Sequence, residues 1–199
     1  MVYVGAMRKS EELARRWMPG LRQGSSRPAW AHPQDLVQLL GELRVAFATH
    51  EEDVLFSELE QDSFESLEDI AWAHDLLEDG RKEDGTLVVA EDLLREGLPV
   101  EIVKIVGFLS HNEGAEEKVT YLARLKTVLD AKGSIVKLVD RICNLREGRA
   151  VFKDRRWARY VRETKDFILP LLDQVAQPEK GWLEDRLLEA LAARPVVEV

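Results

Sequence analysis

Apolar residues recur at intervals of three and four along most of this chain. No segment keeps the strict alternation of apolar and polar residues that a half-buried strand requires. Prolines and glycines stand between the periodic segments, where they begin or end helices. The 199 residues are enough to bury a sizeable core. The sequence therefore predicts an all-α helical bundle that forms a single compact domain.

The expected helix boundaries follow from residues that cap or end helices. Ser66 and Asp69 resemble a capping box for the helix that carries His74, and Gly80 ends that helix. Pro170 is expected to kink or fray its own helix. The predicted helices cover residues 10–17, 33 onward, 66–79, 86–96, 99–109, 115–130, 134–147, 154–173 and 182–193.

The segment AWAHDLLEDG, residues 71–80, carries an unusual amount of charge for a helix that begins with apolar residues. At about 100° per residue, His74, Asp75, Glu78 and Asp79 share one arc of the helix surface. Three carboxylates held together and partly out of water repel one another unless cations or protons offset the charge. A metal ion is the simplest compensation.

Two further residues have the side chains and surroundings of metal ligands. His32 stands just before an expected helix start, and Asp140 interrupts the apolar run SIVKLVDRICNL. Taken alone, Asp140 could also be the buried partner of Arg141 or Lys137. The set of two imidazoles and two carboxylates, His32, His74, Asp75 and Asp140, suits a divalent ion with open positions for water.

Composition limits the chemistry further. The single cysteine, Cys143, excludes an internal disulfide and a Cys-rich zinc site, so His and carboxylate ligands remain, which favour Mn, Fe, Mg or Zn. A net charge of −9 argues against a broad nucleic-acid surface, although local arginines could hold a small anion. No apolar run approaches a membrane span and no secretory signal begins the chain, so we expect a cytoplasmic protein.

Three motifs in this order resemble those of HD-domain metal-dependent phosphohydrolases, most closely the hydrolase domain of RelA/SpoT alarmone enzymes. They are PAWAHP at residues 28–33, AHDLLED at 73–79 and VKLVDRICNLR at 136–146, and the likeness spans residues 8–173. The resemblance implies an HD-domain helical bundle. Residues 1–178 would form the HD-type domain, with 179–199 as a C-terminal helix that packs on it.

The resemblance also implies an activity and roles for individual residues. Such enzymes remove the 3′-pyrophosphate from guanosine tetra- or pentaphosphate with Mn²⁺, and we expect a free-standing small alarmone hydrolase of this type. Another divalent ion could replace Mn²⁺. The implied assignments are His32, His74, Asp75 and Asp140 as metal ligands, Glu78 and Asp79 as catalytic residues, and Arg22, Asn144, Arg141 and Arg146 as substrate contacts.

Several residues depart from the pattern of these hydrolases. Ala29 replaces Tyr, Gly80 and Glu147 each replace a common Thr, and Ser110-His111 lies near an expected Thr-Lys. The acidic insertion at 50–66 is either a lid or, as we favour, a neutral surface excursion in which His50 is not a ligand. We also expect the loop that contains His111 to be a plain surface loop.

Two alternative functions stay open at this point. One is a nucleotidase or another phosphohydrolase that acts on a different small phosphate ester. The other is a nucleotide-sensing or antitoxin-like protein that keeps the fold without turnover. In each case the expected partner is a small nucleotide rather than a nucleic acid or a membrane, and the oligomeric state is open, with a homodimer as one option.

Overall fold

The structure is a computed structural model that describes residues 7–22, 26–48, 60–112 and 114–193. These residues form helices and contain no strand, and only the isolated bridges Leu21–Pro28 and Arg81–Leu87 pair extended backbone. The all-α prediction is therefore confirmed. The helices are α1 (Lys9–Trp17), α2 (Ala31–Ala48), α3 (Glu60–Ala73), α4 (Leu76–Asp79), α5 (Ala90–Arg95), α6 (Val100–Leu109), α7 (Lys118–Val128), α8 (Ala131–Val151), α9 (Asp154–Glu163) and α10 (Glu179–Ala192).

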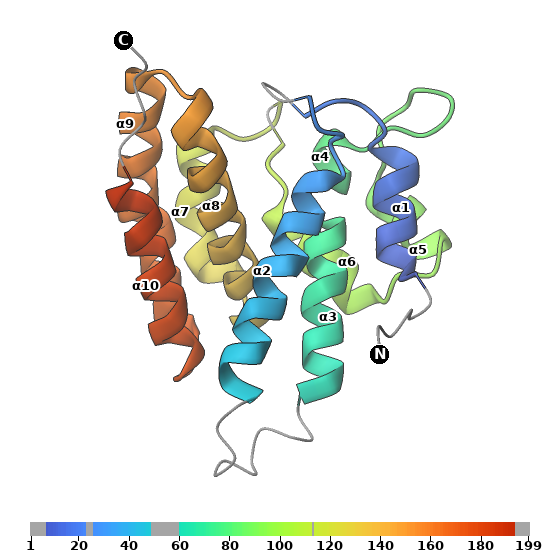
Figure 1. The fold of residues 1–199 in the computed structure, drawn as a ribbon. Coiled ribbons are helices and arrows are strands. Elements are labelled where there is room, and N and C mark those ends of the chain that lie inside the picture. The colour runs from blue at the N-terminus through green and yellow to red at the C-terminus, as the bar shows by residue number, and fades with distance from the viewer. Residues whose placement is uncertain (1–6, 23–25, 49–59, 113, 194–199) are drawn as a thin grey trace.

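Helices α2, α3 and α8 contact one another and form the centre of the bundle. Figure 1 shows α2 and α3 side by side, with the start of α2 and the end of α3 at the same end of the bundle. Helix α1 packs on α3, and α10 packs on α8. This antiparallel arrangement brings residues near 32 and 74 together. The division of the chain at residue 178 stays a prediction.

The centre of the bundle is built from aliphatic side chains that the helical period places on inward faces. Each fully buried side chain of this kind contributes about 1.5–3 kcal/mol relative to exposure. The leucines of α2 are all buried. Side chains without measurable exposure in these three helices include Leu36, Leu40 and Leu43 of α2, Ile70 of α3, and Leu138 and Ile142 of α8.

The helix that was expected to carry residues 66–79 without interruption is divided in two. Helix α3 begins at Glu60, so Ser66 lies inside the helix rather than at its start, and the predicted capping box is wrong. The carboxylate of Asp69 instead accepts a hydrogen bond from Ser10 Oγ at 2.5 Å. Helix α3 ends at Ala73, and a turn precedes α4, which ends before Gly80 as predicted. The single helical arc assumed for His74 to Asp79 therefore does not exist.

Other boundaries differ where side chains satisfy the backbone in ways that spacing does not reveal. Helix α2 begins at Ala31 rather than at Pro33. Helix α5 begins only at Ala90, because Thr86 folds back on Asp84. The Asp84 carboxylate accepts hydrogen bonds from the N–H of Thr86 at 3.0 Å and from the hydroxyl of Thr86 at 2.6 Å. Helix α8 begins early because the Asp130 carboxylate caps it through Gly133 N at 2.8 Å.

The C-terminal part also departs from the expected helices. The helix predicted over 154–173 ends as α9 at Glu163 and continues as a π-helical segment, Thr164–Ile168, and a 3-10 segment, Leu169–Gln174. Pro170, which has no N–H to donate, lies in the 3-10 segment, so the expected disturbance is present. Helix α10 begins at Glu179 rather than at the predicted position 182. Among the described residues, no helix is both long and apolar enough to cross a bilayer.

Gly148 was expected to follow the end of a helix, but α8 continues through it to Val151. A Cβ at this position would lie 2.5 Å from Phe152 Cε2, which is too close. The Phe152 ring is held from its other sides by Tyr160, with ring centroids 5.3 Å apart, and by Arg156, whose Cζ lies 4.0 Å from the ring centroid. The glycine is therefore needed for packing.

We predict that Gly148→Ala lowers the free energy of unfolding by about 1–3 kcal/mol, the usual effect of overpacking. Gly41→Ala in α2 is the matched control, because a Cβ there meets no atom within 4 Å. A helical Gly→Ala change in open space is neutral or stabilising by up to about 1 kcal/mol. Urea denaturation of both variants measures the difference, and equal stabilities would contradict the packing role.

Candidate metal centre

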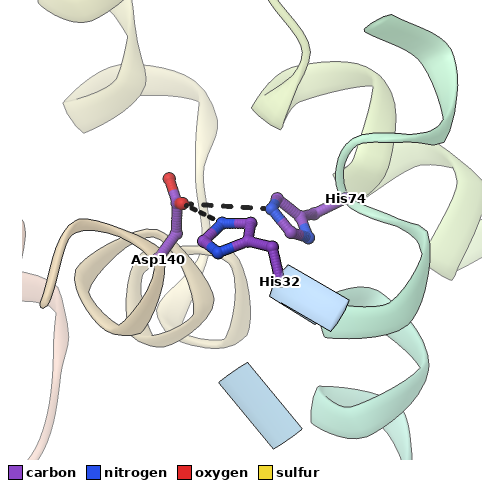
Figure 2. Close-up of side chains that lie close together, drawn as sticks. All are labelled: His32, His74 and Asp140. Carbon is purple, nitrogen blue, oxygen red and sulfur yellow. Dashed lines mark hydrogen bonds and ion pairs between the residues drawn. The ribbon is translucent and has the colours of Figure 1, made fainter. Parts of the chain in front are cut away.

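Two histidines and one aspartate meet inside the bundle, as Figure 2 shows. His32 lies in the first turn of α2, His74 in the turn after α3, and Asp140 in the middle of α8. Asp140 Oδ1 lies 3.0 Å from His32 Nε2 and 3.9 Å from His74 Nε2. The candidate ligand atoms of the three residues lie within 4.8 Å of one another, and all three residues are buried. These distances suit a single divalent ion.

The imidazole of His74 is oriented as a metal ligand would be. Its Nδ1 lies 2.7 Å from the carbonyl oxygen of Ala71, so the hydrogen-bond pattern assigns the proton to Nδ1. Its Nε2 is buried and has no hydrogen-bond partner, although Asp75 Oδ1 lies 3.0 Å away. A buried nitrogen lone pair without a partner is costly, and a divalent cation would satisfy it. The residues therefore fit a metal ion.

The charge around His74 supports the same conclusion. Burial alone would lower the pKa of His74, but the carboxylates of Asp75 and Asp140 outweigh burial and raise that pKa to about 9. Two carboxylates thus attract a positive charge to this position strongly enough to hold an additional proton. A divalent cation would offset the same negative charge.

Asp140 is held by three side chains from α2 and α8. Its Oδ1 also accepts a hydrogen bond from Asn144 Nδ2, and its Oδ2 lies 3.0 Å from Lys137 Nζ. Burial alone would raise the pKa of Asp140, but Lys137 and the imidazoles hold it well below its ordinary value. From the sequence, Lys137 is only one possible partner of a buried Asp140 without a metal. The spacing of three residues, which places both side chains on one face of α8, is the feature of the sequence that predicts this contact.

Asp75 stands at the edge of this group. Its carboxylate touches His74 Nε2, but it is not one of the three residues whose ligand atoms are all mutually close. Its side chain is 22% exposed, compared with 4% for that of His74. The carboxylate faces a cavity next to the centre. Its role as a fourth ligand stays a prediction.

The two predicted catalytic carboxylates lie in α4, beside Asp75. Glu78 Oε1 accepts a hydrogen bond of 2.6 Å from the backbone N–H of His111. Burial, reinforced by the charge of Asp75, raises the pKa of Glu78 to about 7, and the same two causes raise the pKa of Asp79. Both carboxylates therefore lie next to the proposed ligands in an environment of strong negative charge.

The loop that contains His111 is more than the plain surface loop we expected. Its backbone holds Glu78, and the His111 ring packs against Tyr121 with ring centroids 5.0 Å apart. His111 Nε2 also hydrogen-bonds the carbonyl oxygen of Glu116 at 2.8 Å. The expectation was wrong because a contact made by a backbone N–H leaves no signal in the sequence. His50 and most of the 50–66 insertion lie outside the described residues.

A cavity of about 900 Å³ opens beside the centre and is lined by Asp75, Asp79 and Asn144. Its size matches that of a small-molecule binding site. Both cationic and aromatic side chains line it. The cationic ones are Arg22, Arg27, Arg81, Arg146 and Arg156, and the aromatic ones are Trp17, Phe152 and Tyr160.

Arg22, Asn144 and Glu147 are connected within the cavity wall. Arg22 Nε lies 2.7 Å from Glu147 Oε2, and Arg22 Nη2 lies 2.6 Å from Asn144 Oδ1. Since Asn144 also donates to Asp140, this chain of contacts joins the cavity wall to the centre. Glu147, noted in the sequence only as a departure from a common Thr, is thus the partner of Arg22.

Arg141 does not line this cavity. It is buried, with Cζ 3.9 Å from the Tyr160 ring centroid and Nη1 3.4 Å from Thr164 Oγ1. These contacts hold α8 to α9 and to the segment that follows it, so we exclude Arg141 from the proposed substrate contacts. The predicted contacts Arg22, Arg146 and Asn144 do line the cavity.

Two other departures from the hydrolase pattern have a structural setting. Ala29 lines the cavity, where the expected tyrosine would reduce its volume. Gly80 follows α4, and a Cβ there would lie 2.3 Å from the carbonyl oxygen of Leu76. The backbone in this conformation therefore leaves no space for a threonine after Asp79.

The fold of this helical bundle is shared with a solved structure. Among solved structures, the chain is similar to a metazoan ortholog of SpoT, which hydrolyzes ppGpp and plays a role in starvation responses. The TM-score is 0.68 with 16% sequence identity, over 95% of this chain and 98% of the other. No protein-family model matches the sequence, and a search of curated proteins gave no significant match. The comparison confirms the fold predicted from the resemblance.

We predict that His74→Ala abolishes stoichiometric binding of Mn²⁺, because it removes the partnerless Nε2. His111→Ala is the matched control, since that imidazole lies outside the group of mutually close ligands. Elemental analysis after identical Mn²⁺ loading measures the difference. Equal metal contents in wild type and His74→Ala would show that the site is misassigned.

Removal of the metal should also lower the melting temperature of the wild-type protein. An ion that binds only the folded state stabilises it by about 2.7 kcal/mol when its free concentration is 100 times Kd. Thermal unfolding with and without a chelator measures this effect. An unchanged melting temperature, in both wild type and His111→Ala, would contradict a tight site.

Proposed function

We propose that this chain is a metal-dependent phosphohydrolase that removes pyrophosphate from the 3′ position of a nucleotide, as a (p)ppGpp-like alarmone hydrolase. The observation that carries the proposal is the buried group of His32, His74 and Asp140, with the partnerless His74 Nε2, beside an arginine-lined cavity. The similarity in fold to a ppGpp hydrolase supports the choice of substrate.

Mn²⁺ is the proposed ion, with another divalent ion as the alternative. His32, His74 and Asp140 would hold it, and Asp75 would complete the set from the cavity side. A divalent ion supplies Lewis acidity, which lowers the pKa of water and stabilises negative charge on a phosphoryl group.

Glu78 and Asp79 are the proposed catalytic residues. Both carboxylates lie beside Asp75, and neither is one of the three mutually close ligands. Glu78 is held in place by the N–H of His111, which orients one oxygen and leaves the other available. A carboxylate in this position can orient a water molecule and accept its proton. Proteins that only bind nucleotides have no chemical need for these two additional carboxylates.

The cavity provides the proposed binding site for the substrate. A chain with a net charge of −9 must hold a polyanion through local cations, and Arg146 is exposed at the cavity wall. Arg22 and Asn144 lie on the same wall and are connected to Asp140. The partner in this proposal is a small nucleotide, with no role for a nucleic acid or a membrane. The cytoplasmic location stays a prediction, and the oligomeric state, including a homodimer, stays open.

We predict that the Mn²⁺-loaded protein releases pyrophosphate from guanosine 3′,5′-bispyrophosphate faster than it releases phosphate from GTP. The reason is that the 3′ group would lie at the metal centre while the nucleoside occupies the cavity. Chromatographic analysis of both products, with Mn²⁺, Mg²⁺ or Zn²⁺, measures the rates. Efficient cleavage at the 5′ end with an intact 3′ group would favour a nucleotidase, and tight binding without turnover would favour a sensing protein.

We predict that Glu78→Ala and Asp79→Ala retain the metal but lose turnover, because both lie beside the ligands without belonging to the buried group. Loss of a general base or a water-orienting group typically costs about 10²- to 10⁴-fold in rate. Glu83→Ala, at an exposed carboxylate in the loop after α4, is the control and should keep full activity. Metal content and kcat are measured together. Wild-type kcat in both site variants would remove these residues from the mechanism.

A further inference from the structure

The part of the cavity wall formed by Arg22 and Glu147 is electrically balanced. Arg22 Nε and Glu147 Oε2 lie 2.7 Å apart, and their side chains are only 19% and 29% exposed. This contact joins residues 125 positions apart in the sequence, so tertiary packing creates it. Because both groups are partly withdrawn from solvent, their attraction is screened only weakly. The positive and negative charges largely cancel, so the pair has little net charge to offer a ligand.

This balance changes what Arg22 can bind. A phosphate group placed here would meet the carboxylate of Glu147 as well as the guanidinium of Arg22, and the repulsion would cancel much of the attraction. The phosphates of a nucleotide are therefore better placed toward Asp75 and the metal centre. The nucleoside is then the part of the substrate that lies against Arg22 and Glu147.

The two side chains offer a defined hydrogen-bonding pattern to a nucleobase. A carboxylate only accepts hydrogen bonds and has lone pairs beyond the one that Arg22 occupies. A guanidinium has five N–H groups, of which the contacts with Glu147 and Asn144 use only part. The cavity wall thus presents acceptors and donors side by side.

Guanine is the common nucleobase that matches this pattern. Its edge presents the N1–H and N2–H donors next to the O6 acceptor, so a carboxylate can accept from both donors while a guanidinium donates to O6. Adenine presents the N1 acceptor beside its N6–H donors, so its N1 lone pair would face a carboxylate without a proton between them. The arrangement therefore favours guanine over adenine.

We propose that Glu147 is a specificity-determining residue that selects a guanine base by accepting hydrogen bonds from its N1–H and N2–H groups. Arg22 positions the Glu147 carboxylate and supplies a donor for O6. This inference rests on the proposed function, because it assumes that a nucleotide occupies the cavity with its phosphates toward the metal centre.

The test compares three substrates that differ only in the base. Guanosine, inosine and adenosine 3′,5′-bispyrophosphates are hydrolysed by wild type, by Glu147→Gln and by Glu101→Gln, a control at an exposed carboxylate of α6. In wild type, kcat/KM should be about 10-fold or more higher for guanosine than for adenosine, with inosine, which lacks the 2-amino group, in between. In Glu147→Gln the ratio should fall to within about 3-fold, while Glu101→Gln keeps the wild-type ratio.

A Glu147→Gln protein that keeps the wild-type base preference would overturn the inference, as would a wild type without any preference. Glu147→Ala is a second variant and should lose the preference in the same way. If no substrate is hydrolysed, the proposed function fails, and calorimetric titration of GDP, IDP and ADP then tests the base site alone. A GDP preference that Glu147→Gln removes would support it, and equal affinities in wild type would overturn it.

Discussion

The buried carboxylate of Asp140 is the group on which the rest of the site depends. It lies in the middle of α8, among fully buried aliphatic side chains, where an unpaired charge would be costly. Lys137, His32 and Asn144 satisfy it, and the contact with His32 ties α8 to the start of α2. The same interactions that make this charge tolerable thus fix the positions of the candidate metal ligands.

The break between α3 and α4 determines where the side chains of His74, Asp75 and Asp79 lie. A continuous helix would have kept Asp75, Glu78 and Asp79 in one arc with His74. In the structure, the turn at His74 and Asp75 lets the His74 ring point inward to Asp140, while Asp75 and Asp79 reach the cavity. The break therefore separates a buried candidate ligand, His74, from the two carboxylates that line the cavity, as the proposed hydrolysis requires.

The wall of the cavity is unevenly charged. Arginines line its wall, but some of that charge is already balanced internally, as the Arg22–Glu147 and Arg27–Asp35 pairs show. Aromatic rings of Phe152 and Tyr160 form another part of the wall. A wall of this kind can hold the charged end of a ligand at one place and its uncharged end at another, which a uniformly basic pocket would not do.

The sequence by itself determined the helical class and the residues of the buried group. Helical periodicity is a local property of the sequence. A carboxylate within an apolar run, such as Asp140, indicates a buried charge that needs a partner. The tertiary structure alone decided that Arg141 packs on Tyr160, that His111 holds Glu78, and that Glu147 faces Arg22. These outcomes depend on contacts between residues far apart in the chain, whose free energies no local pattern of residues encodes.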